Sequence, residues 1–259
     1  MKKKTLIIML VLSLAFSLAS CSNSAATATD QSVITIAAAA SLKNCLDDAL
    51  IPMFNDIYPD ILVKSTYDSS GKLQMQIQEG ADIDVFISAS MKEMDKLNEK
   101  GLLIDDSVVQ LLENKIVLIV PENNSKEING FEDILKAERI ALGDPASVPA
   151  GQYAKEALTN LNIWDEALGK ASLGTNVTQV LNWVAEGSAE AGIVYSTDAA
   201  SRPGVKVVAE AAEGSVSKVI YPVGIVKTSK DKYSAKKFIE FLQSHQAKEV
   251  FRSYGFIAR

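Results

Sequence analysis

From Val33 onward, short apolar runs alternate with segments of helical periodicity, and this alternation constrains the fold more than any other feature. Val33–Ile36 is β-branched and predicts a strand, and apolar residues then recur every three or four positions up to Ile57, which predicts a helix. The pattern continues with strands expected at 61–67 and 84–88 and helices expected at 73–78 and 92–99. Repeated strand–helix units predict a parallel sheet with helices on both faces.

A second series of the same kind follows an expected short helix after 105–107 and an apolar strand within 114–121. Its helices are expected at 131–136, 151–161, 165–170, 178–185, 233–242 and 246–254, and its strands at 139–142, 191–195, 205–209 and 216–226. Two such series predict an α/β fold of two doubly wound lobes joined by a hinge, with 117–120 and 221–226 passing between the lobes. We expect 33–116 and 222–259 in lobe I, and 117–221 in lobe II.

The first twenty residues have the composition of a secretory signal rather than of a folded element. Three lysines precede the uncharged run Thr5–Ser20, which is shorter than the roughly 20 residues that a membrane-spanning helix needs. Leu18–Cys21 resembles a bacterial lipobox, in which the cysteine becomes the lipid-modified first residue of the mature chain. We therefore expect a signal peptide at 1–20, lipidation at Cys21, a flexible tether at 21–32, and an exported protein anchored to the outer face of the cell membrane. An ordinary signal peptide with a chance cysteine is the alternative.

Charge and the scarcity of two residue types exclude several classes of protein. The chain has 26 Lys and Arg against 32 Asp and Glu, a net charge of −6, which argues against a nucleic-acid partner because phosphate binding needs a basic face. Without residues 1–20 the balance becomes 23 − 32 = −9. One histidine, His245, and two cysteines, Cys21 and Cys45, cannot supply a zinc finger, a histidine-based triad or a disulfide framework.

Small polar residues stand repeatedly where an expected strand ends and a helix begins. Ser41 follows a run of alanines, and Ser70 with Gly71 opens the second helix. In the second half, Pro149–Gly151 and Thr175–Thr178 open two further helices. The N–H groups in the first turn of a helix carry the positive end of its dipole, so these four starts form a candidate anion site. Each serine taken alone also fits a helix cap that needs no ligand.

Candidate catalytic groups give a weaker indication of function than these helix starts do. Three carboxylate clusters occur, at Asp47/Asp48, Asp82/Asp84 and Asp105/Asp106. They could hold Mg²⁺ or act as an acid–base pair, but neighbouring side chains on a strand or loop point apart, so solvated faces explain them. The Gly71-Lys72 pair lacks the spacing of a phosphate-binding loop, and the chain has no G-x-S-x-G nucleophile elbow. We therefore expect that the protein is not an enzyme and has no cofactor and no direct protein–metal ligand. A carboxylate-dependent, lipid-anchored hydrolase is the distant alternative.

Several motifs, in order along the chain, carry a resemblance to a known family. They are Ala37–Leu42, Ser69-Ser70 before Gln76-Ile77, Ala81–Ala89, Gly143–Pro145 followed by Val148–Ala154, Gly192–Tyr195 and Tyr254–Phe256. Each motif is weak alone, but their order and spacing together are specific. Over nearly all of 33–256 the chain resembles the molybdate-binding proteins of bacterial ABC importers, within the type II periplasmic binding protein superfamily. The resemblance implies the two-lobed fold of that superfamily.

The resemblance also implies which residues hold the ligand. The oxyanion, molybdate or tungstate, would lie between the lobes, held by the hydroxyl and amide of Ser41 and of Ser70, the amides of Ala150 and Val177, and the hydroxyl of Tyr195. Four of these residues lie at the helix starts described above, whereas periodicity alone makes Tyr195 a core residue at a strand end. The implied partner is an ABC permease in the membrane, and we expect a monomer. A binder of sulfate or phosphate with the same fold is the alternative.

Two positions depart from the family's pattern. Gly71 stands where many relatives carry a third serine, which removes a hydroxyl at the edge of the expected site. Asp68 lies just before the serine pair and puts a carboxylate near the expected anion. A site made of donors alone would reject phosphate, which carries a proton near neutral pH, so Asp68 is the residue that could change this selectivity.

Overall fold

The computed structural model describes residues 31–259, and Ser32–Arg259 form one compact unit. The expected signal peptide at 1–20, the lipidation site Cys21 and most of the expected tether lie outside the described residues. Ser32, the final residue of that expected tether, is the first residue of strand β1 and pairs with Ile61. No helix among residues 31–259 has the length and apolar character needed to cross a membrane.

Six strands form the first sheet, in the order β11-β4-β10-β3-β1-β2. They are β1 (Ser32–Ala39), β2 (Ile61–Asp68), β3 (Val85–Ile87), β4 (Val109–Asn114), β10 (Val219–Ile225) and β11 (Ile257–Ala258). β1 pairs in parallel with β2 and β3, as the strand–helix units predict. β10 pairs antiparallel with β3 and β4, and β11 antiparallel with β4. The expectation of a wholly parallel sheet is therefore wrong at β10 and β11, because β10 returns from the second sheet and runs the other way.

Five strands form the second sheet, in the order β7-β6-β8-β5-β9. They are β5 (Ile116–Pro121), β6 (Ile140–Gly143), β7 (Ala171–Gly174), β8 (Ala191–Tyr195) and β9 (Val205–Glu210). β6 pairs in parallel with β7 and β8, whereas β5 pairs antiparallel with β8 and β9. Each sheet thus combines parallel strands with antiparallel ones, and the antiparallel strands β5 and β10 are those that the chain enters from the other sheet.

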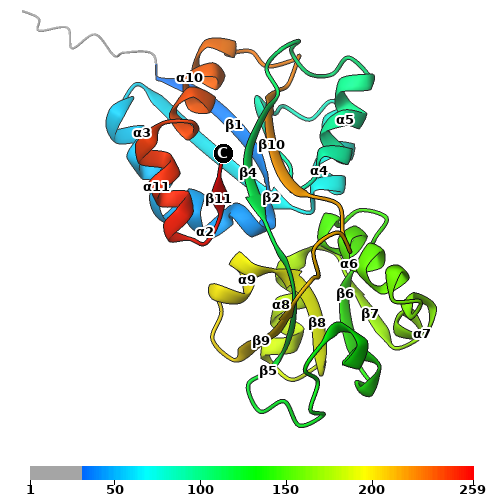
Figure 1. The fold of residues 1–259 in the computed structure, drawn as a ribbon. Coiled ribbons are helices and arrows are strands. Elements are labelled where there is room, and N and C mark those ends of the chain that lie inside the picture. Colours follow the sequence, from blue (N-terminus) through cyan, green and yellow to red (C-terminus); the bar gives the residue numbers. More distant parts are fainter. Residues whose placement is uncertain (1–30) are drawn as a thin grey trace, which may run out of the picture. The chain divides into compact units, whose positions relative to one another are not determined.

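The chain passes between the sheets twice. Lys115 alone joins β4 to β5, and residues 211–218 join β9 to β10, as the continuous ribbons of Figure 1 show. Of the runs expected to pass between the lobes, 117–120 lies within β5 and 221–225 lies within β10, each shortly after one of these two connections. The expected lobe boundaries at 116/117 and 221/222 stay a prediction.

Helices cover the sheets, and several of them begin directly after a strand ends. The helical segments are η1 (Ala40–Leu42), α2 (Lys43–Cys45), η2 (Leu46–Leu50), α3 (Ile51–Ile57), α4 (Ser70–Gln78), α5 (Met91–Glu99), η3 (Phe131–Lys136), α6 (Pro149–Asn160), α7 (Trp164–Gly169), α8 (Val177–Ala185), α9 (Ser196–Ala200), α10 (Lys232–Leu242) and α11 (His245–Ser253). Figure 1 shows α3, α10 and α11 on one face of the first sheet and α4 and α5 on the other. The expected short helix after 105–107 is wrong, because this segment pairs with β10 as strand β4.

The first sheet is held by an aromatic cluster under α3 and α10. The rings of Phe54 and Phe238 meet edge to face with centroids 5.1 Å apart, and Phe241 lies 5.5 Å from Phe54. Phe54 and Phe238 are fully buried. Burial of apolar area contributes about 25 cal/mol per Å², so this cluster helps to hold α10 against β1 and α3 against β2.

Candidate functional site

Helix starts from both sheets meet around one small cavity. Its lining consists of Ala39, Ala40, Ser41, Asp68, Ser69, Ser70 and Ala89 from the side of the first sheet, and Val148, Pro149, Ala150, Val177 and Tyr195 from the side of the second. All five residues expected to hold a ligand, Ser41, Ser70, Ala150, Val177 and Tyr195, lie on this lining. Their role as ligands stays a prediction, but the structure brings them together from positions more than 150 residues apart in sequence.

Ser41 lies in the 3-10 turn that follows β1 directly. The alanines at the end of β1 are buried and small, so this turn packs closely against the sheet. The N-cap residue of the turn is Ala39 and makes no side-chain cap. The hydroxyl of Ser41 is instead 2.9 Å from the phenol oxygen of Tyr221. Capping alone therefore does not explain why a serine stands here.

Ser70 is the first residue of α4 and is fully buried. Its Oγ accepts a hydrogen bond from the backbone N–H of Ala89 at 2.9 Å, which leaves the hydroxyl proton of Ser70 available to donate. The N-cap of α4 is Ser69, whose buried Oγ caps nothing and has no hydrogen-bond partner within the described part of the chain. The cap-only interpretation fails for Ser70 as well, since the capping position belongs to its neighbour.

The second sheet supplies two helix starts with backbone donors. Ala150 is in the first turn of α6, directly after Pro149. A Cβ on Gly151 would lie 2.0 Å from the carbonyl oxygen of Gly143, so only glycine permits the close turn that brings α6 over the end of β6. Val177 is the first residue of α8, and first-turn N–H groups have no partner within their own helix.

Tyr195 ends β8 and is 1 % exposed. Burial raises the pKa of its phenol, so the hydroxyl stays protonated and can donate a hydrogen bond. Its Oη is 3.5 Å from the carbonyl oxygen of Ala89, on the side of the first sheet. Its ring meets that of Tyr221 with centroids 5.6 Å apart. Sequence periodicity alone makes Tyr195 a core residue, and in the structure it is both buried and part of the lining.

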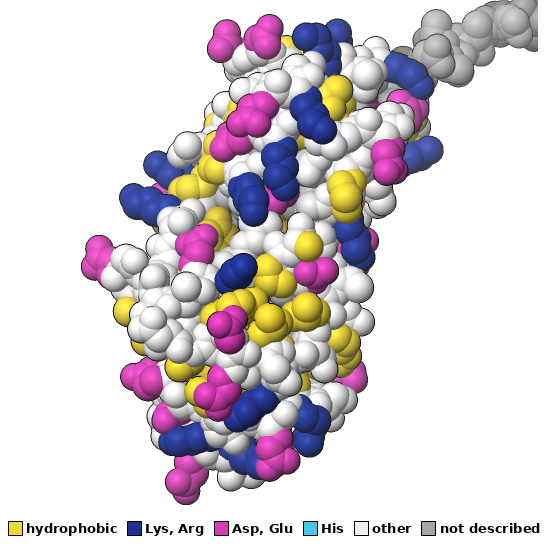
Figure 2. Space-filling view, turned by 90° about the vertical axis from the view of Figure 1, so that its right-hand side faces the viewer, with side chains coloured by type: hydrophobic (Ala, Val, Ile, Leu, Met, Phe, Trp, Pro, Cys, Tyr) yellow, Lys and Arg dark blue, Asp and Glu magenta, His cyan; other side chains and the backbone are white. Residues whose placement is uncertain are grey.

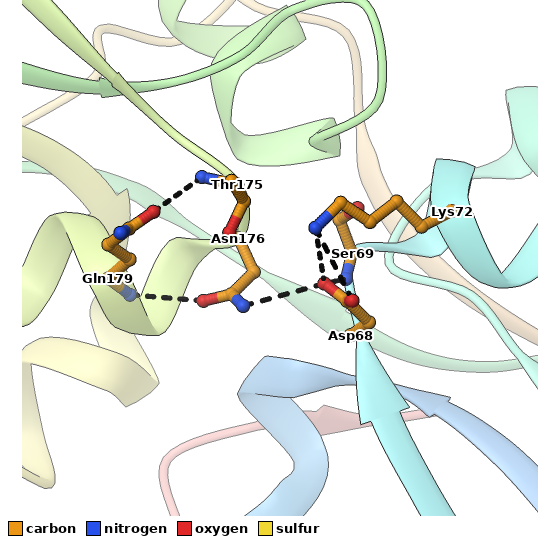
Figure 3. Close-up of polar contacts among 6 residues, drawn as sticks. All are labelled: Asp68, Ser69, Lys72, Thr175, Asn176 and Gln179. Atoms are coloured by element: carbon orange, nitrogen blue, oxygen red, sulfur yellow. Dashed lines mark hydrogen bonds and ion pairs between the residues drawn. The ribbon is translucent and has the colours of Figure 1, made fainter.

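The carboxylate of Asp68 is held by three donors (Figure 3). Its Oδ1 lies 2.7 Å from the backbone N of Ser69, 3.3 Å from Lys72 Nζ and 3.4 Å from Asn176 Nδ2. Lys72 thus balances the only charged side chain on the lining, which contains no Lys, Arg or His. Asn176, the N-cap of α8, belongs to the second sheet and also accepts at Oδ1 from the N–H of Gln179. The carboxylate therefore links the two sheets beside the cavity.

Gly71, the other departure from the family's pattern, also lies between the sheets. Its N–H donates to the carbonyl oxygen of Ser147 at 2.9 Å. A Cβ at this position would lie 2.5 Å from the same oxygen, closer than such atoms approach. The glycine therefore permits a backbone contact between α4 and the segment before α6, which a serine side chain would block.

The carboxylate clusters have structural partners away from the cavity. Asp84 accepts from the N–H of Thr35 at 2.7 Å and from the hydroxyl of Ser229 at 2.6 Å. Asp82 pairs with Lys230 at 2.8 Å on the surface. Among residues 31–259, no group of three or more His, Cys, Asp or Glu side chains could hold a metal ion. Of these clustered carboxylates, none lines the cavity.

The fold has two sheets, each covered by helices, and the chain passes between them twice. Both sides present hydroxyl and amide donors at a shared cavity. These features define a two-lobed solute-binding protein of the periplasmic type. The chain belongs to the family of bacterial extracellular solute-binding proteins, whose model matches residues 34–257. The expected α/β fold of two doubly wound, type II-like lobes is thereby confirmed. Members of this family bind solutes rather than transform them, which agrees with the expectation that the chain is not an enzyme.

Three comparisons show which proteins the chain is similar to. A Bacillus subtilis protein, named as an ABC transporter substrate-binding lipoprotein, is 41% identical over 92% of this chain and 91% of its own length. A molybdate-binding protein of Haemophilus influenzae is 41% identical over 87% of this chain and 90% of its own length. A structure described as the substrate-binding domain of a molybdenum ABC transporter from Clostridium difficile is 38% identical, with a TM-score of 0.67 over 87% of this chain and 98% of its own.

Proposed function

We propose that this protein captures molybdate, and tungstate with it, in the cavity between its two sheets and delivers it to the permease of an ABC importer. The observation that carries the proposal is the meeting of Ser41, Ser70, Ala150, Val177 and Tyr195 on one lining without a Lys, Arg or His among the lining residues. The names of the Haemophilus influenzae and Clostridium difficile relatives support this choice of anion.

Neutral donors suit a dianion that carries no proton. Molybdate can only accept hydrogen bonds, and each bond to a charged partner contributes about 1.5–3 kcal/mol. About seven hydroxyl and amide donors would then give roughly 10–20 kcal/mol before the costs of desolvation and closure. Micromolar affinity needs about 8 kcal/mol and nanomolar affinity about 12 kcal/mol. Hydroxyls, amides and helix dipoles are therefore sufficient without a cation.

The surface charge fits this mode of binding. The net charge is −6, and Figure 2 shows basic and acidic side chains interspersed over one face of the molecule. An anion is then held by short-range donors in the cavity and not by a basic patch on that face. The two helix starts on each side of the cavity supply those donors when the sheets come together over the ligand.

Sulfate and phosphate are the competing ligands. Phosphate near neutral pH carries a proton and needs an acceptor, and the carboxylate of Asp68 is already engaged by Ser69 and Asn176 at Oδ1 and by Lys72 at both oxygens. Sulfate carries no proton, so only the size of the closed cavity can discriminate against it. We propose that both bind more weakly than molybdate.

The anchoring and assembly of the protein belong to the same proposal. We propose that Cys21 is lipidated after removal of 1–20, and that residues 21–31 tether the binding unit to the outer face of the membrane. The lipoprotein named in Bacillus subtilis supports this anchoring. We propose that the protein works as a monomer, since each chain contributes both sides of its own cavity.

Isothermal titration calorimetry with molybdate, tungstate, sulfate and phosphate tests the function. We expect molybdate and tungstate to bind tightly and the other two weakly. Ser70→Ala should weaken molybdate binding by about 1–3 kcal/mol because one ligand oxygen loses its donor. Ser244→Ala is the matched control: Ser244 is the N-cap of α11, is not part of the cavity lining, and its replacement should leave affinity unchanged. Folded, ligand-free protein that gives no heat with molybdate would contradict the proposal.

A further inference from the structure

A chain of hydrogen bonds leads from Ser41 away from the cavity to the end of β4. Ser41 Oγ lies 2.9 Å from Tyr221 Oη, and Asn114 Nδ2 lies 3.3 Å from the same phenol oxygen. Tyr221 is fully buried in β10, and Asn114, the last residue of β4, is 7 % exposed. Neither residue lines the cavity. Both therefore stand behind Ser41, one and two hydrogen bonds from the cavity.

The orientation of the Asn114 amide is fixed by its oxygen. Asn114 Oδ1 lies 2.8 Å from the backbone N of Lys115 and 2.9 Å from Ser196 Oγ. A backbone N–H can only donate, so the atom that faces it must be the acceptor Oδ1, and the other terminal atom must be the NH₂ group. The two NH₂ protons then go to Thr197 Oγ1, at 2.9 Å, and to Tyr221 Oη. Asn114 is a donor to Tyr221, not an acceptor.

The phenol of Tyr221 can donate one hydrogen bond, and only one of its two contacts can accept it. Within residues 31–259, its Oη has hydrogen-bond contacts with Asn114 Nδ2, which donates, and with Ser41 Oγ. Burial raises the pKa of Tyr221, so the phenol keeps its proton. If Ser41 donated to Tyr221, the buried phenol proton would have no acceptor, which is unfavourable. The phenol must therefore donate to Ser41 Oγ.

We propose that Asn114 and Tyr221 are positioning residues that set the direction of the Ser41 hydroxyl, so that its proton points to the bound oxyanion. Asn114 N–H donates to Tyr221, Tyr221 O–H donates to Ser41, and Ser41 O–H donates to the anion. The inference rests on the proposed function, because only an acceptor ligand requires this polarity. An undirected serine hydroxyl would spend part of its time pointing its proton toward Tyr221 and its lone pairs toward a dianion.

The position of Asn114 connects this polarity to the crossing between the sheets. Asn114 ends β4 and is separated from β5 only by Lys115, and its amide also contacts Ser196 and Thr197 of α9. The group that directs Ser41 is thus held by contacts on the side of the second sheet. The orientation of the Ser41 hydroxyl then depends on the contacts that Asn114 makes with Lys115 and α9 at the β4–β5 connection.

A double-mutant cycle on the full chain tests the inference, with molybdate as the probe and calorimetry as the readout. Tyr221→Phe removes the phenol oxygen and keeps the ring, and we expect the Kd to rise about 3- to 10-fold. Ser41→Ala removes the hydroxyl itself and should raise the Kd about 10- to 100-fold. In the Ser41→Ala background, Tyr221→Phe should cause no further rise, because Tyr221 acts only through that hydroxyl.

A second variant reverses the polarity. Asn114→Asp replaces the amide donor with an acceptor of the same shape, so that Tyr221 would donate to residue 114 and Ser41 would donate to Tyr221. We expect a larger rise in Kd than for Tyr221→Phe. In the Ser41→Ala background the rise should be smaller, because there is no Ser41 hydroxyl to turn away from the ligand. Tyr58→Phe is the matched control: the ring of Tyr58 packs against Phe54, Tyr58 is not part of the cavity lining, and loss of its hydroxyl should leave the Kd unchanged.

The outcomes separate this inference from the proposed function. If the wild-type protein does not bind molybdate, both the proposed function and the proposed positioning role of Asn114 and Tyr221 are wrong. If the wild-type protein binds molybdate, two results would overturn the positioning role alone. One is an unchanged Kd in Tyr221→Phe. The other is an equal rise in Kd in the wild-type and Ser41→Ala backgrounds, because Tyr221 would then act through packing and not through the Ser41 hydroxyl. Should Tyr221→Phe fail to fold, the Asn114→Asp cycle decides by the same criterion.

Discussion

The carboxylate of Asp68 accepts a hydrogen bond from the side-chain amide of Asn176, with 3.4 Å between Oδ1 and Nδ2 (Figure 3). Asp68 ends β2 in the first sheet, whereas Asn176 is the N-cap of α8 beside the second. Each residue adjoins a helix start that lines the cavity, so the pair forms only when those helix starts are close together. We expect it to stabilise the closed arrangement in which donors from both sheets surround the ligand.

Substitutions of Asn176 test this link without losing the helix cap. Asn176→Ser keeps a capping oxygen for α8 but removes the amide, and should raise the Kd for molybdate about 2- to 5-fold. Asn176→Asp also keeps the cap but places a second carboxylate opposite Asp68, and should raise the Kd about 10-fold or more through repulsion. Stopped-flow measurements should show the change mainly as faster dissociation. Equal affinities in both variants and wild type would mean that the link carries no energy.

Gly71→Ala tests the backbone contact between the sheets. The new Cβ would lie 2.5 Å from the carbonyl oxygen of Ser147, so the contact cannot form as it stands. We expect molybdate binding to weaken by about 1–3 kcal/mol, because closure must accommodate the added methyl group. Small-angle scattering with saturating molybdate should show a less compact particle. Gly169→Ala, at a position where a Cβ meets nothing within 4 Å, should leave affinity and scattering unchanged.

Asp198 should make stability depend on pH. Burial raises the pKa of this carboxyl to about 7, and its Oδ2 has no hydrogen-bond partner within the described residues. The folded state keeps a proton that the unfolded chain has already released, so stability should fall by about 1.4 kcal/mol per pH unit between about pH 4 and pH 7 and then level off. Asp198→Asn removes this titration and should flatten the dependence of Tm on pH.

The comparison needs a carboxylate on the protein surface. Asp56→Asn, on the exposed face of α3, should leave the slope of Tm against pH as in the wild type. Thermal unfolding from pH 4 to pH 8 decides the matter. Parallel slopes for wild type and Asp198→Asn would show that Asp198 is ionised in the fold, contrary to this prediction.

Thiol reactivity tests both a buried side chain and the anchor. Cys45 is 1 % exposed, and burial raises the pKa of its thiol, so it should react with iodoacetamide only after unfolding. With Cys21 lipidated, protein from membranes should show no reactive thiol when native and one in urea. A thiol that reacts rapidly in the native protein would identify Cys21 as free and contradict the proposed lipid anchor.

The sequence predicted the parts of the site that depend on local order. Ser41 and Ser70 follow strands and open helices, and this local pattern is visible in the chain itself. Tyr195 needed the family resemblance, because a tyrosine at the end of an apolar strand has the same pattern whether it fills a core or faces a cavity. The two sheets followed from the alternation of strands and helices, except where distant pairing decided the outcome, as in β4.

What the sequence did not predict depends on contacts between distant segments. Tyr221 lies in the apolar strand β10 and meets Ser41 across 180 positions of sequence. Asn114 carries no local signal, since its amide matters only through Lys115, α9 and Tyr221. The partners of Asp68 also come from two places, Lys72 on its own side and Asn176 on the other. Periodicity and helix-start signals report short-range geometry and contain none of these pairings.

The unequal crossings between the sheets offer a route to a molybdate biosensor. Lys115 alone connects β4 to β5, while residues 211–218 form the second connection and include Gly214, whose Cβ position is open. Exposed loop tips tolerate inserted domains well. A circularly permuted fluorescent domain placed at Gly214 would be strained by any turn of one sheet against the other. The single-residue connection and every residue that lines the cavity would remain as they are, so brightness would report occupancy.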